Sequence, residues 1–425
     1  MEVAVEYTKL KHLKSDSFCY GANESADRTD EGDPRYIRIT DIKDDGSLRE
    51  DTLRTLPREI AGAYLLHEGD ILLARSGATV GKAFFYQEIL GEACFAGYLI
   101  RFRPDKTKAY PRFIWFYTQS KIYQQEVELS TLQATIQNVS AERYGEFVVP
   151  TFPIEKQIEI ATFLDRKTAA IDTLIAKKQR LIELLEEKRA ALINQAVTKG
   201  LNPDVPMKDS GIPWISEIPE HWKITKLKWL SPFITVGIVI TPSKYYVDEG
   251  IPCLRSLNIK PGEILSKNLV YISEESNNLL AKSKIFKGDL VCVRTGQPGT
   301  TAVVDERFEN ANCIDLILIR KTKKASSEFL CLQMNSEVCR SQYTVGTSGA
   351  IQQHFNVETA QNLILCDPPL GEQADIVTHC RKIIAQYNLL IQKAFVQIEK
   401  LQEYRQSLIT AAVTGKLEVP VDERA

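Results

Sequence analysis

The chain has 425 residues, of which 44% are hydrophobic and 25% are charged, and its formal net charge is −2. These values are typical of a globular protein of roughly two to four domains, and they exclude a strongly basic nucleic-acid-binding protein. The sequence has no uncharged apolar run of about 18 residues and no basic-then-apolar start, so we expect neither a membrane span nor a signal peptide.

Nine cysteines are scattered singly along the chain, and none forms a C-x-x-C pair. The five histidines do not cluster near them. This pattern favours reduced, mostly buried thiols in a cytoplasmic protein over disulfides or a zinc site.

The first 150 residues alternate short β-rich runs with glycine-containing turns. GDILLAR (69–75) and YLIRFRP (98–104) predict strands, and PRFIWFYTQS opens one amphipathic helix near residues 110–128. We therefore expect a mixed α/β globular domain over residues 1–150.

A long helix is predicted to begin at Pro153, because proline fits the first turn of a helix and Glu155 suits its positive end. Neither proline nor glycine recurs for over 40 residues. A helix of about 45 residues would be roughly 65 Å long. We expect this helix over residues 151–201, followed by a linker rich in proline and turn residues over 202–224.

The second half of the chain repeats the first. Residues 153–201 align without a gap with residues 369–417, and 19 of the 49 pairs are identical. HEGDILLARSG (67–77) likewise matches FKGDLVCVRTG (286–296), and TKLKHL (8–13) matches TKLKWL (225–230). We therefore expect a second globular domain over 225–366, with one helix near 327–345, and a second long helix and tail over 367–425.

Apolar residues recur at sevens in both long helices, which is typical of a coiled coil. Since each helix is too long to be covered by its own domain, we expect the two to pair antiparallel, with internal pseudo-two-fold symmetry. The fold class is then α+β, with two mixed α/β domains separated by the helices. The predicted helix-pair interface consists of Ile171, Leu174, Ile175, Ile182, Leu185, Leu192, Leu390, Ile391, Ile398, Leu401 and Leu408.

Three motifs resemble catalytic sites but lack the residues that catalysis needs. CDPPLGEQ (366–373) contains the D-P-P of amino-methyltransferases, but Leu370 stands where an aromatic residue would stack on a flipped base. GATVGKA (77–83) is one residue too short between its glycines for a phosphate loop. Asp70 and Asp289 could suggest the acid of a nuclease site, but no E-x-K motif follows on the next strand. We therefore expect both aspartates to be turn residues at the start of a strand. The chain is predicted not to be an enzyme.

In the order of its segments, the whole chain resembles the specificity subunit of type I restriction–modification enzymes. The resemblance rests on G-D-[IL]-x5-G in each globular segment and on the P-x3-Q helix openings. EKRAALINQAVTKGL and EYRQSLITAAVTGKL close the two helices, and IPEHWKITKLKWL leads into the second domain.

This resemblance implies that each globular domain is a target recognition domain for one half of a bipartite, asymmetric site in double-stranded DNA. The helices would fix the spacer and dock two methylation subunits, which hold S-adenosylmethionine and methylate adenine. Restriction subunits, as a further partner, would bring ATP-driven cleavage. No cofactor is expected in this chain itself. The alternative is a coiled-coil adaptor with duplicated protein-binding domains, which predicts no methylation partner.

Comparison of the two copies supplies candidate DNA-binding residues. Arg75 and Arg294 end the G-D strand in both copies and suit phosphate or a guanine edge, with a structural ion pair as the alternative. Polar residues that differ between the two copies in matching loops are candidate base readers. The alternative for each of them is a solvated loop residue with no DNA contact. The candidates are Arg38, Thr40, Arg75, Ser76, Thr79, Lys82, Gln133, Thr135, Gln137, Asn138, Arg255, Asn258, Arg294, Thr295, Gln297, Thr300, Ser348, Gln352, Gln353 and His354.

Overall fold

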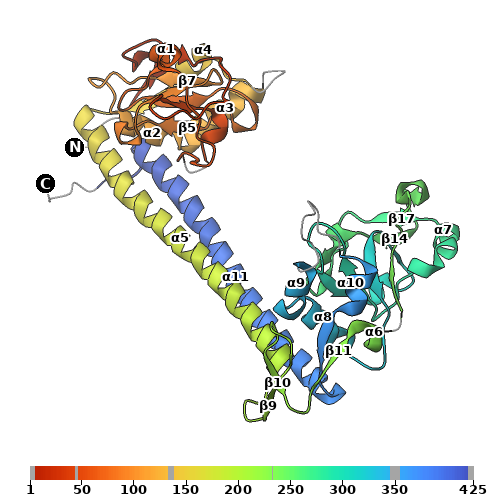
Figure 1. Ribbon diagram of the computed structural model, residues 1–425. Helices are drawn as coiled ribbons and strands as arrows, with labels where there is room; N and C mark the ends of the chain where they lie inside the picture. Colours follow the sequence, from red (N-terminus) through yellow and green to blue (C-terminus); the bar gives the residue numbers. More distant parts are fainter. Residues whose placement is uncertain (1–4, 44–45, 133–137, 232, 345–354, 420–425) are drawn as a thin grey trace. The chain divides into compact units, whose positions relative to one another are not determined.

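The computed structural model describes residues 5–43, 46–132, 138–231, 233–344 and 355–419 (Figure 1). Its contacts divide the chain into two compact units, residues 1–179 with 395–425, and residues 180–394. Both boundaries fall inside the two long helices, α5 (Ile154–Lys199) and α11 (Leu370–Val413). Each unit therefore contains a globular part and a portion of both helices.

The globular part of the first unit is built on an antiparallel four-stranded sheet of order β2-β7-β4-β5. A parallel pair, β3–β6, and an antiparallel pair, β1–β8, accompany it. The strands are β1 Glu6–Lys9, β2 Cys19–Tyr20, β3 Arg35–Ile37, β4 Ile71–Ala74, β5 Ala83–Phe85, β6 Ala93–Phe95, β7 Leu99–Phe102 and β8 Val148–Thr151. The helices are α1 Arg58–Ala61, α2 Pro111–Thr118, α3 Lys121–Leu132 and α4 Ala141–Gly145.

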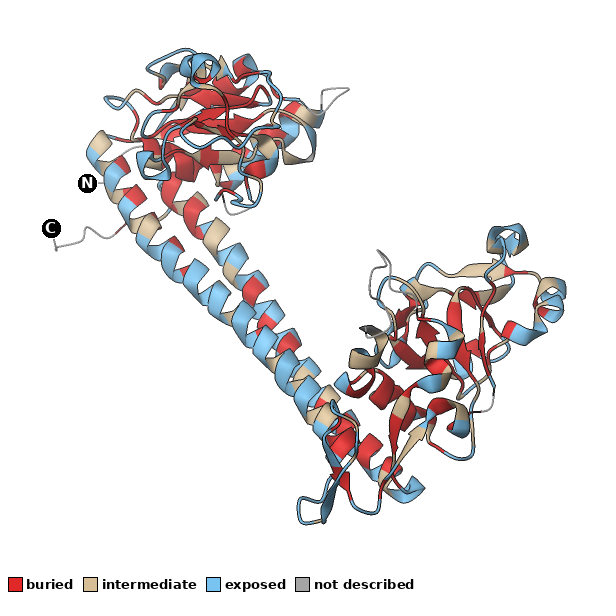
Figure 2. Ribbon diagram, in the orientation of Figure 1, coloured by how far each residue is buried: buried red, intermediate tan, exposed pale blue. Residues whose placement is uncertain are grey.

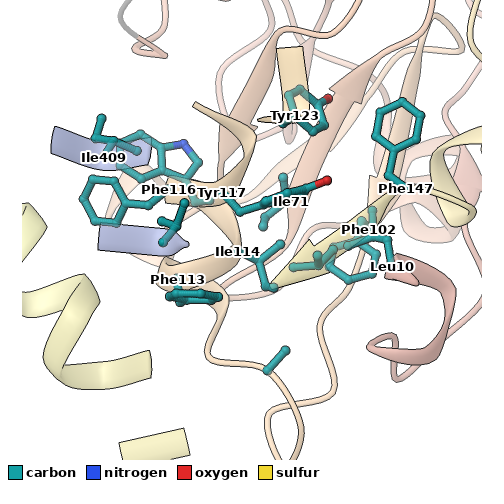
Figure 3. Close-up of a cluster of buried hydrophobic side chains, with 14 of the residues drawn as sticks. Leu10, Ile71, Phe102, Phe113, Ile114, Phe116, Tyr117, Tyr123, Phe147 and Ile409 are labelled. Atoms are coloured by element: carbon teal, nitrogen blue, oxygen red, sulfur yellow. The ribbon is translucent and has the colours of Figure 1, made fainter. Parts of the chain in front are cut away.

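The four-stranded sheet of the first unit is buried on both faces, with alternate residues on opposite sides as strand geometry requires. Ile71 and Leu73 join a cluster with helix α2, whereas Leu72 and Ala74 join a second cluster with β3 and β6. The first cluster also takes Ile409 from α11 (Figure 3). The last turns of α11 therefore help to close the first globular part.

The globular part of the second unit repeats this plan with a four-stranded sheet of order β12-β21-β18-β19. A second sheet has the order β13-β17-β14-β20. Three separate two-stranded sheets, β11–β22, β15–β16 and β9–β10, accompany these two. The strands are β9 Met207–Asp209, β10 Glu217–Pro219, β11 Lys223–Lys226, β12 Ile234–Val236, β13 Tyr246–Val247, β14 Ile251–Leu254, β15 Ile259–Lys260, β16 Glu263–Ile264, β17 Val270–Ile272, β18 Leu290–Val293, β19 Thr301–Val303, β20 Asn312–Cys313, β21 Leu316–Ile319 and β22 Ile364–Asp367. The shorter helices are α6 Leu227–Leu230, α7 Glu274–Leu279, α8 Ser327–Met334, α9 Glu337–Thr344 and α10 Val357–Asn362.

The core of the second unit follows the same alternation. Leu290 and Cys292 of β18 pack with α8 and the start of α11, while Val291 and Val293 pack with β14, β15 and β16. In both units the central strands of the four-stranded sheet, β4 with β7 and β18 with β21, are buried throughout, whereas the long helices expose much of their surface (Figure 2). The predicted α+β fold class is confirmed.

The single helix predicted after each sheet is instead two helices, α2 and α3 in one unit and α8 and α9 in the other. A serine stands at each break, and Ser120 Oγ and Ser336 Oγ each bond back to the carbonyl three residues earlier. Serine competes with the helical backbone in this way and favours helix ends. The hydrophobic spacing continued across the break, so periodicity alone did not reveal it.

The Gly-Asp motif fixes a turn through a buried carboxylate. Asp70 is 1% exposed, and Arg103 Nε and Nη2 donate to its two oxygens at 2.7 and 2.8 Å. Asp289 is equally buried and pairs with Arg320, and it also accepts the Lys321 N–H at 2.9 Å. Each aspartate therefore lies in the predicted turn and also forms an ion pair with the arginine that follows β7 or β21. Both carboxylates are occupied by these contacts.

The P-x3-Q motif ties each long helix to its globular part. Gln157 Oε1 accepts the Tyr110 N–H at 2.9 Å, while its Nε2 donates to the Phe152 carbonyl at 2.8 Å. In the second unit Gln373 Oε1 accepts the Ser326 N–H at 2.8 Å. Both glutamines are 1% exposed. The amide thus satisfies a backbone N–H at the start of α2 or α8, which would otherwise be buried without a partner.

Portions of α5 and α11 pack together within each unit. In the first unit, Arg405 Nε donates to Asp172 Oδ1 at 2.9 Å, and Lys178 Nζ donates to Gln397 Oε1 at 2.6 Å. Because residue numbers rise along one helix as they fall along the other, the two helices run antiparallel there.

The second unit repeats one of these contacts. Arg189 donates to Asn388, and these residues are the equivalents of Arg405 and Asp172 at the 216-residue offset. The duplication in the sequence is therefore reproduced in the way the two helices meet.

The residues turned inward between the helices follow the three-four spacing of a coiled coil. Leu174 and Leu390 were expected among them but are 42% and 40% exposed, which corrects the prediction for these two residues. Each lies one position before a seam residue, and one helical step turns a side chain by about 100° away from the seam. The buried and half-buried seam residues are Ile171, Ile175, Lys178, Ile182, Leu185, Arg189 and Leu192 on α5, and Ile383, Tyr387, Ile391, Ala394, Ile398, Leu401, Arg405 and Leu408 on α11.

Candidate nucleic-acid interface

One end of the four-stranded sheet in the first unit gathers residues from three parts of the sequence. Arg75 follows β4, and its backbone N–H donates to the carbonyl of Tyr98, which precedes β7, at 3.0 Å. The Val139 N–H in turn donates to the Arg75 carbonyl at 2.8 Å. The segment that begins at Asn138 and the loop after the G-D strand therefore meet at this end of the sheet.

Arg75 lies half-buried against an aromatic ring. Its guanidinium carbon is 4.8 Å from the ring centroid of Tyr20, at the end of β2, and its Nε donates to Asn138 Oδ1 at 3.3 Å. Tyr98 is 63% exposed beside it. Ser76 pairs with Asn138 through an isolated bridge. The arrangement sets a cation against the ring of Tyr20, with an exposed tyrosine on the neighbouring backbone, a combination that suits phosphate and stacked bases.

The second unit places Arg294 at the equivalent position, after β18. The Phe355 N–H donates to the Arg294 carbonyl at 3.1 Å, which repeats the contact of Val139 with Arg75. The side-chain partners differ, however, because Arg294 Nη1 donates to Asp315 Oδ1 at 2.8 Å. Thr295 Oγ1 also donates to Asp315 Oδ2, at 3.4 Å. Asp315 occupies the position of Tyr98.

The turn that follows each arginine packs closely against a helix at a glycine, against α3 in the first unit and α9 in the second. Gly81 has φ +84°, and a Cβ there would lie 2.7 Å from Val127 Cγ1 on α3. Gly299 has φ +85°, and a Cβ would lie 1.8 Å from Tyr343 Cε2 on α9. Positive φ and close approach both require glycine. GATVGKA is thus a turn between strands β4 and β5 and not a phosphate loop before a helix.

The remaining candidates in these turns are accessible to different degrees. Thr79, Lys82 and Thr300 are half-buried, and Gln297 is exposed. Lys82 lines a groove of about 980 Å³ in the first unit, together with residues of α3 and of both long helices. The turns therefore offer polar side chains next to the arginine in each unit.

Three further candidates, Arg38, Asn258 and Arg255, hydrogen-bond to their own loops and stabilise the fold. Arg38 donates to Asp41 Oδ1 at 2.8 Å and to the Thr52 carbonyl at 2.9 Å. Asn258 is fully buried and donates to the Leu265 and Lys267 carbonyls, so we withdraw it as a base reader.

Arg255, the equivalent of Arg38, donates to the Asn268 carbonyl at 2.7 Å. Thr40 is exposed next to the Arg38 loop. Recurrence of Arg38 and Arg255 in both copies marked a shared structural position, which comparison of the copies alone does not separate from a shared DNA contact.

Some candidates lie outside the described residues: Gln133, Thr135, Gln137, Ser348, Gln352, Gln353 and His354. Sequence reasoning also missed residues that the structure brings to the interface. Tyr20, Tyr98 and Asp315 stand at strand ends without any motif. Aligning β7 with β21 residue by residue places Tyr98 over Asp315, and this difference beside a shared arginine was the available signal.

The part of the chain that the structure describes offers no metal-binding cluster. No group of three or more His, Cys, Asp or Glu side chains is positioned to hold a metal ion there. The nine cysteines are unpaired, and burial raises the pKa of the Cys292 and Cys331 thiols to about 12. No helix within the described ranges is long and apolar enough to cross a membrane.

Comparison with known proteins gives a consistent family. A family model described as the type I restriction modification DNA specificity domain matches residues 19–184. The EcoKI specificity subunit of Escherichia coli K12 is 25% identical over 82% of this chain and 75% of that protein. The MjaVIII specificity subunit of Methanocaldococcus jannaschii is 23% identical over 84% and 80%, and the EcoBI specificity subunit of Escherichia coli is 22% identical over 95% and 84%.

Solved structures share the fold over nearly the whole chain. A chain from a type I restriction–modification system aligns with a TM-score of 0.74 and 15% identity over 98% of this chain and all of that chain. The HsdS subunit of Thermoanaerobacter tengcongensis aligns with a TM-score of 0.52 and 15% identity over 97% of both chains. By sequence over most of its length, and by fold, the chain is similar to the specificity subunits of type I restriction–modification systems.

Proposed function

We propose that this chain gives a type I restriction–modification complex its DNA specificity, with each globular part reading one half of a bipartite, asymmetric site in double-stranded DNA. The observation that carries the proposal is the shared arginine at the end of the G-D strand. Arg75 is set against Tyr20 and Asn138, whereas Arg294 is set against Asp315. The same scaffold therefore presents one common cation with different neighbours, which is what two different half-sites require.

The two long helices fix the length of DNA between the half-sites in this proposal. Helices α5 and α11 run for 46 and 44 residues, and neither is interrupted. Polar pairs at equivalent positions, Arg405 with Asp172 and Arg189 with Asn388, hold the helices in one register. A fixed register is a requirement for any element that acts as a spacer.

The outer surface of the helices would dock two methylation subunits. Leu174 and Leu390 are equivalent residues, one in each unit, and both remain 40% exposed or more. Further apolar side chains stay exposed on the same helices, including Leu184, Phe395 and Tyr404. Large apolar residues exposed on a helix favour a protein partner. Two equivalent surfaces in one chain favour two copies of that partner.

Catalysis would then lie in the partner subunits. S-adenosylmethionine would be held by the methylation subunits and ATP by restriction subunits, and this chain would bind neither. The chain would act in the cytoplasm, where host DNA and the partner subunits are. Its near-neutral charge, −2 over the whole chain, fits a subunit that shares the enclosure of DNA with partners.

The direct test is single-molecule sequencing of N6-methyladenine in host DNA, with and without the gene for this chain. Loss of methylation at one bipartite motif is the expected result, and the motif itself gives both half-sites and the spacer. Retention of every methylated motif, together with no methyltransferase in a pull-down of the tagged chain, would instead favour the adaptor with protein-binding domains.

A further inference from the structure

Arg294 and Arg75 occupy the same place in the two units, but only Arg294 is paired with an acid. Its side chain is 31% exposed and that of Asp315 is 40% exposed. The pair thus differs from Asp289 with Arg320, whose carboxylate is 1% exposed. An ion pair at such exposure would contribute little to the stability of the fold, because solvent screens the two charges. A positioning role explains its location better.

We propose that Arg294 reads a guanine in the major groove and that Asp315 positions its guanidinium for that contact. This inference rests on the proposed function, that the second globular part reads one DNA half-site. Arginine binds guanine through two parallel hydrogen bonds to O6 and N7, so the plane of the guanidinium has to be held. Asp315 holds it by accepting one hydrogen of Nη1.

The donors that remain are suited to such a contact. Nη1 keeps a second hydrogen and Nη2 has two, whereas Nε is buried and has no partner among the described residues. The two terminal nitrogens are therefore the ones available to an incoming base edge. Thr295 Oγ1 donates to the other carboxylate oxygen and restrains the carboxylate in turn.

The backbone of Asp315 gives an independent indication of a special role. Its φ is +50°, in the left-handed region that residues other than glycine rarely adopt. Its N–H donates to the Ile238 carbonyl at 3.0 Å, which fixes this conformation next to β12. Such strained backbone positions cluster at binding sites. Tyr98, at the same place in the first unit, has no positive φ.

The first test uses the full chain, produced together with the methylation subunits of its own system in a host that lacks it. The methylated motif is sequenced for Arg294→Ala, Arg294→Lys, Asp315→Ala and Asp315→Asn. We expect Arg294→Ala, Arg294→Lys and Asp315→Ala to weaken the preference for guanine at one and the same position of one half-site. The discrimination against other bases there should fall by roughly 5- to 150-fold, which is the range for a bidentate contact. Asp315→Asn keeps one acceptor and should relax that guanine less.

Arg75→Ala is the matched control, because it removes the equivalent arginine of the first unit. It should leave the half-site read by the second unit unchanged. Relaxation of both half-sites by Asp315→Ala would indicate loss of structure and overturn the proposal. An unchanged motif for Arg294→Lys and Asp315→Ala would also overturn it, as would relaxation of a cytosine by Asp315→Ala alone, which would make the carboxylate itself the reader.

The second test alters the DNA, so its main arm uses the natural chain and does not depend on the folding of variants. Each guanine of the half-site is replaced in turn by 7-deazaguanine, which lacks the N7 acceptor, and methylation of the duplex by the complex is measured. We expect one replacement to slow methylation strongly with the natural chain and to have little further effect with Arg294→Lys. Full tolerance of every replacement would contradict the proposal. Absence of any motif that depends on the natural chain would contradict the proposed function instead.

Discussion

The two globular parts of this chain keep the same interior and differ at the end of the sheet. Asp70 with Arg103 and Asp289 with Arg320 form the same buried ion pair, one in each unit. At the sheet end, Tyr98 is replaced by Asp315. Interior groups are hard to change because a lost partner leaves a charge buried, whereas an exposed neighbour of an arginine is free to change. Comparing the two units therefore distinguishes positions that maintain the fold, which are the same in both, from surface positions beside the arginine, which differ.

A second difference lies at the TKLK segments that begin each globular part. In the first unit, Lys9 and Lys11 both pair with Glu146. In the second, Lys228 donates to Asn362, which is the equivalent of Glu146 at the 216-residue offset. The same lysines are retained, but only one unit keeps the negative charge opposite them. We therefore expect the stability of the two units to depend differently on pH.

The largest effects should come from breaking the shared interior pair. Asp70→Ala leaves the Arg103 guanidinium without its carboxylate, and loss of one partner of a buried pair costs about 3–5 kcal/mol. Asp289→Ala should cost a similar amount in the second unit. Hydrogen exchange followed by mass spectrometry reports each unit separately, and each variant should lose protection mainly in its own unit. Equal loss in both units for either variant would break the comparison.

The turn glycines should show a clear difference between the units. Gly299→Ala places a methyl group against the half-buried ring of Tyr343, whereas Gly81→Ala meets the side chain of Val127 at a longer distance. We expect a loss of stability of about 3 kcal/mol for Gly299→Ala and about 2 kcal/mol for Gly81→Ala, from crowding together with unfavourable φ. Gly62→Ala, where φ is −54° and the space is open, is the neutral control in urea unfolding.

A smaller effect is expected where the two helix contacts differ only in charge. Asp172→Asn converts the pair of Arg405 with Asp172 into the type found at Arg189 with Asn388. Since Asp172 is about half exposed, the cost should be at most about 1 kcal/mol and should decrease in high salt. A loss in thermal stability that is independent of salt would show that the contact sets helix register through geometry rather than charge.

The smallest effect should appear only in acid. Hydrogen bonds from Lys11 and Lys9 lower the pKa of Glu146 to about 2, from an ordinary value near 4.5. A lowered pKa means that the contribution to stability is present above about pH 4.5 and is lost as the pH falls towards 2. Glu146→Gln should therefore reduce the stability of the first unit at pH 6 but not at pH 2. Asn362→Gln in the second unit should show no such dependence on pH.

The repeat made most of the architecture predictable. Two copies in sequence implied two similar globular parts, and the proline-free segments implied the long helices. What sequence missed was local: the break at Ser120, which a continuing apolar pattern conceals, and the outward turn of Leu174 and Leu390. Side-chain direction on a helix changes by about 100° per residue, so an apolar residue next to the seam is indistinguishable by composition from one within it.

The interface was predictable only in part, for a related reason. Arg75 and Arg294 stood out because a charge recurred at the end of a strand, and the structure places both at the surface. Arg38 and Arg255 recurred equally but bond to their own loops. The recurrence of an arginine in both copies does not tell whether it contacts its own loop or DNA. That depends on which group its side chain binds, and the sequence does not show this group. Asp315 was invisible for the same reason until the strands were aligned.

The central claim, two separate readers joined by a helical spacer, is tested most directly by lengthening both helices. Seven residues that continue the seam would be inserted after Lys178 and after its equivalent, Ala394, which adds about 10 Å of helix, or about three base pairs. Sequencing of N6-methyladenine should then show both half-sites unchanged and the spacer longer by about that amount. An unchanged spacer, or altered bases in either half-site, would contradict the account.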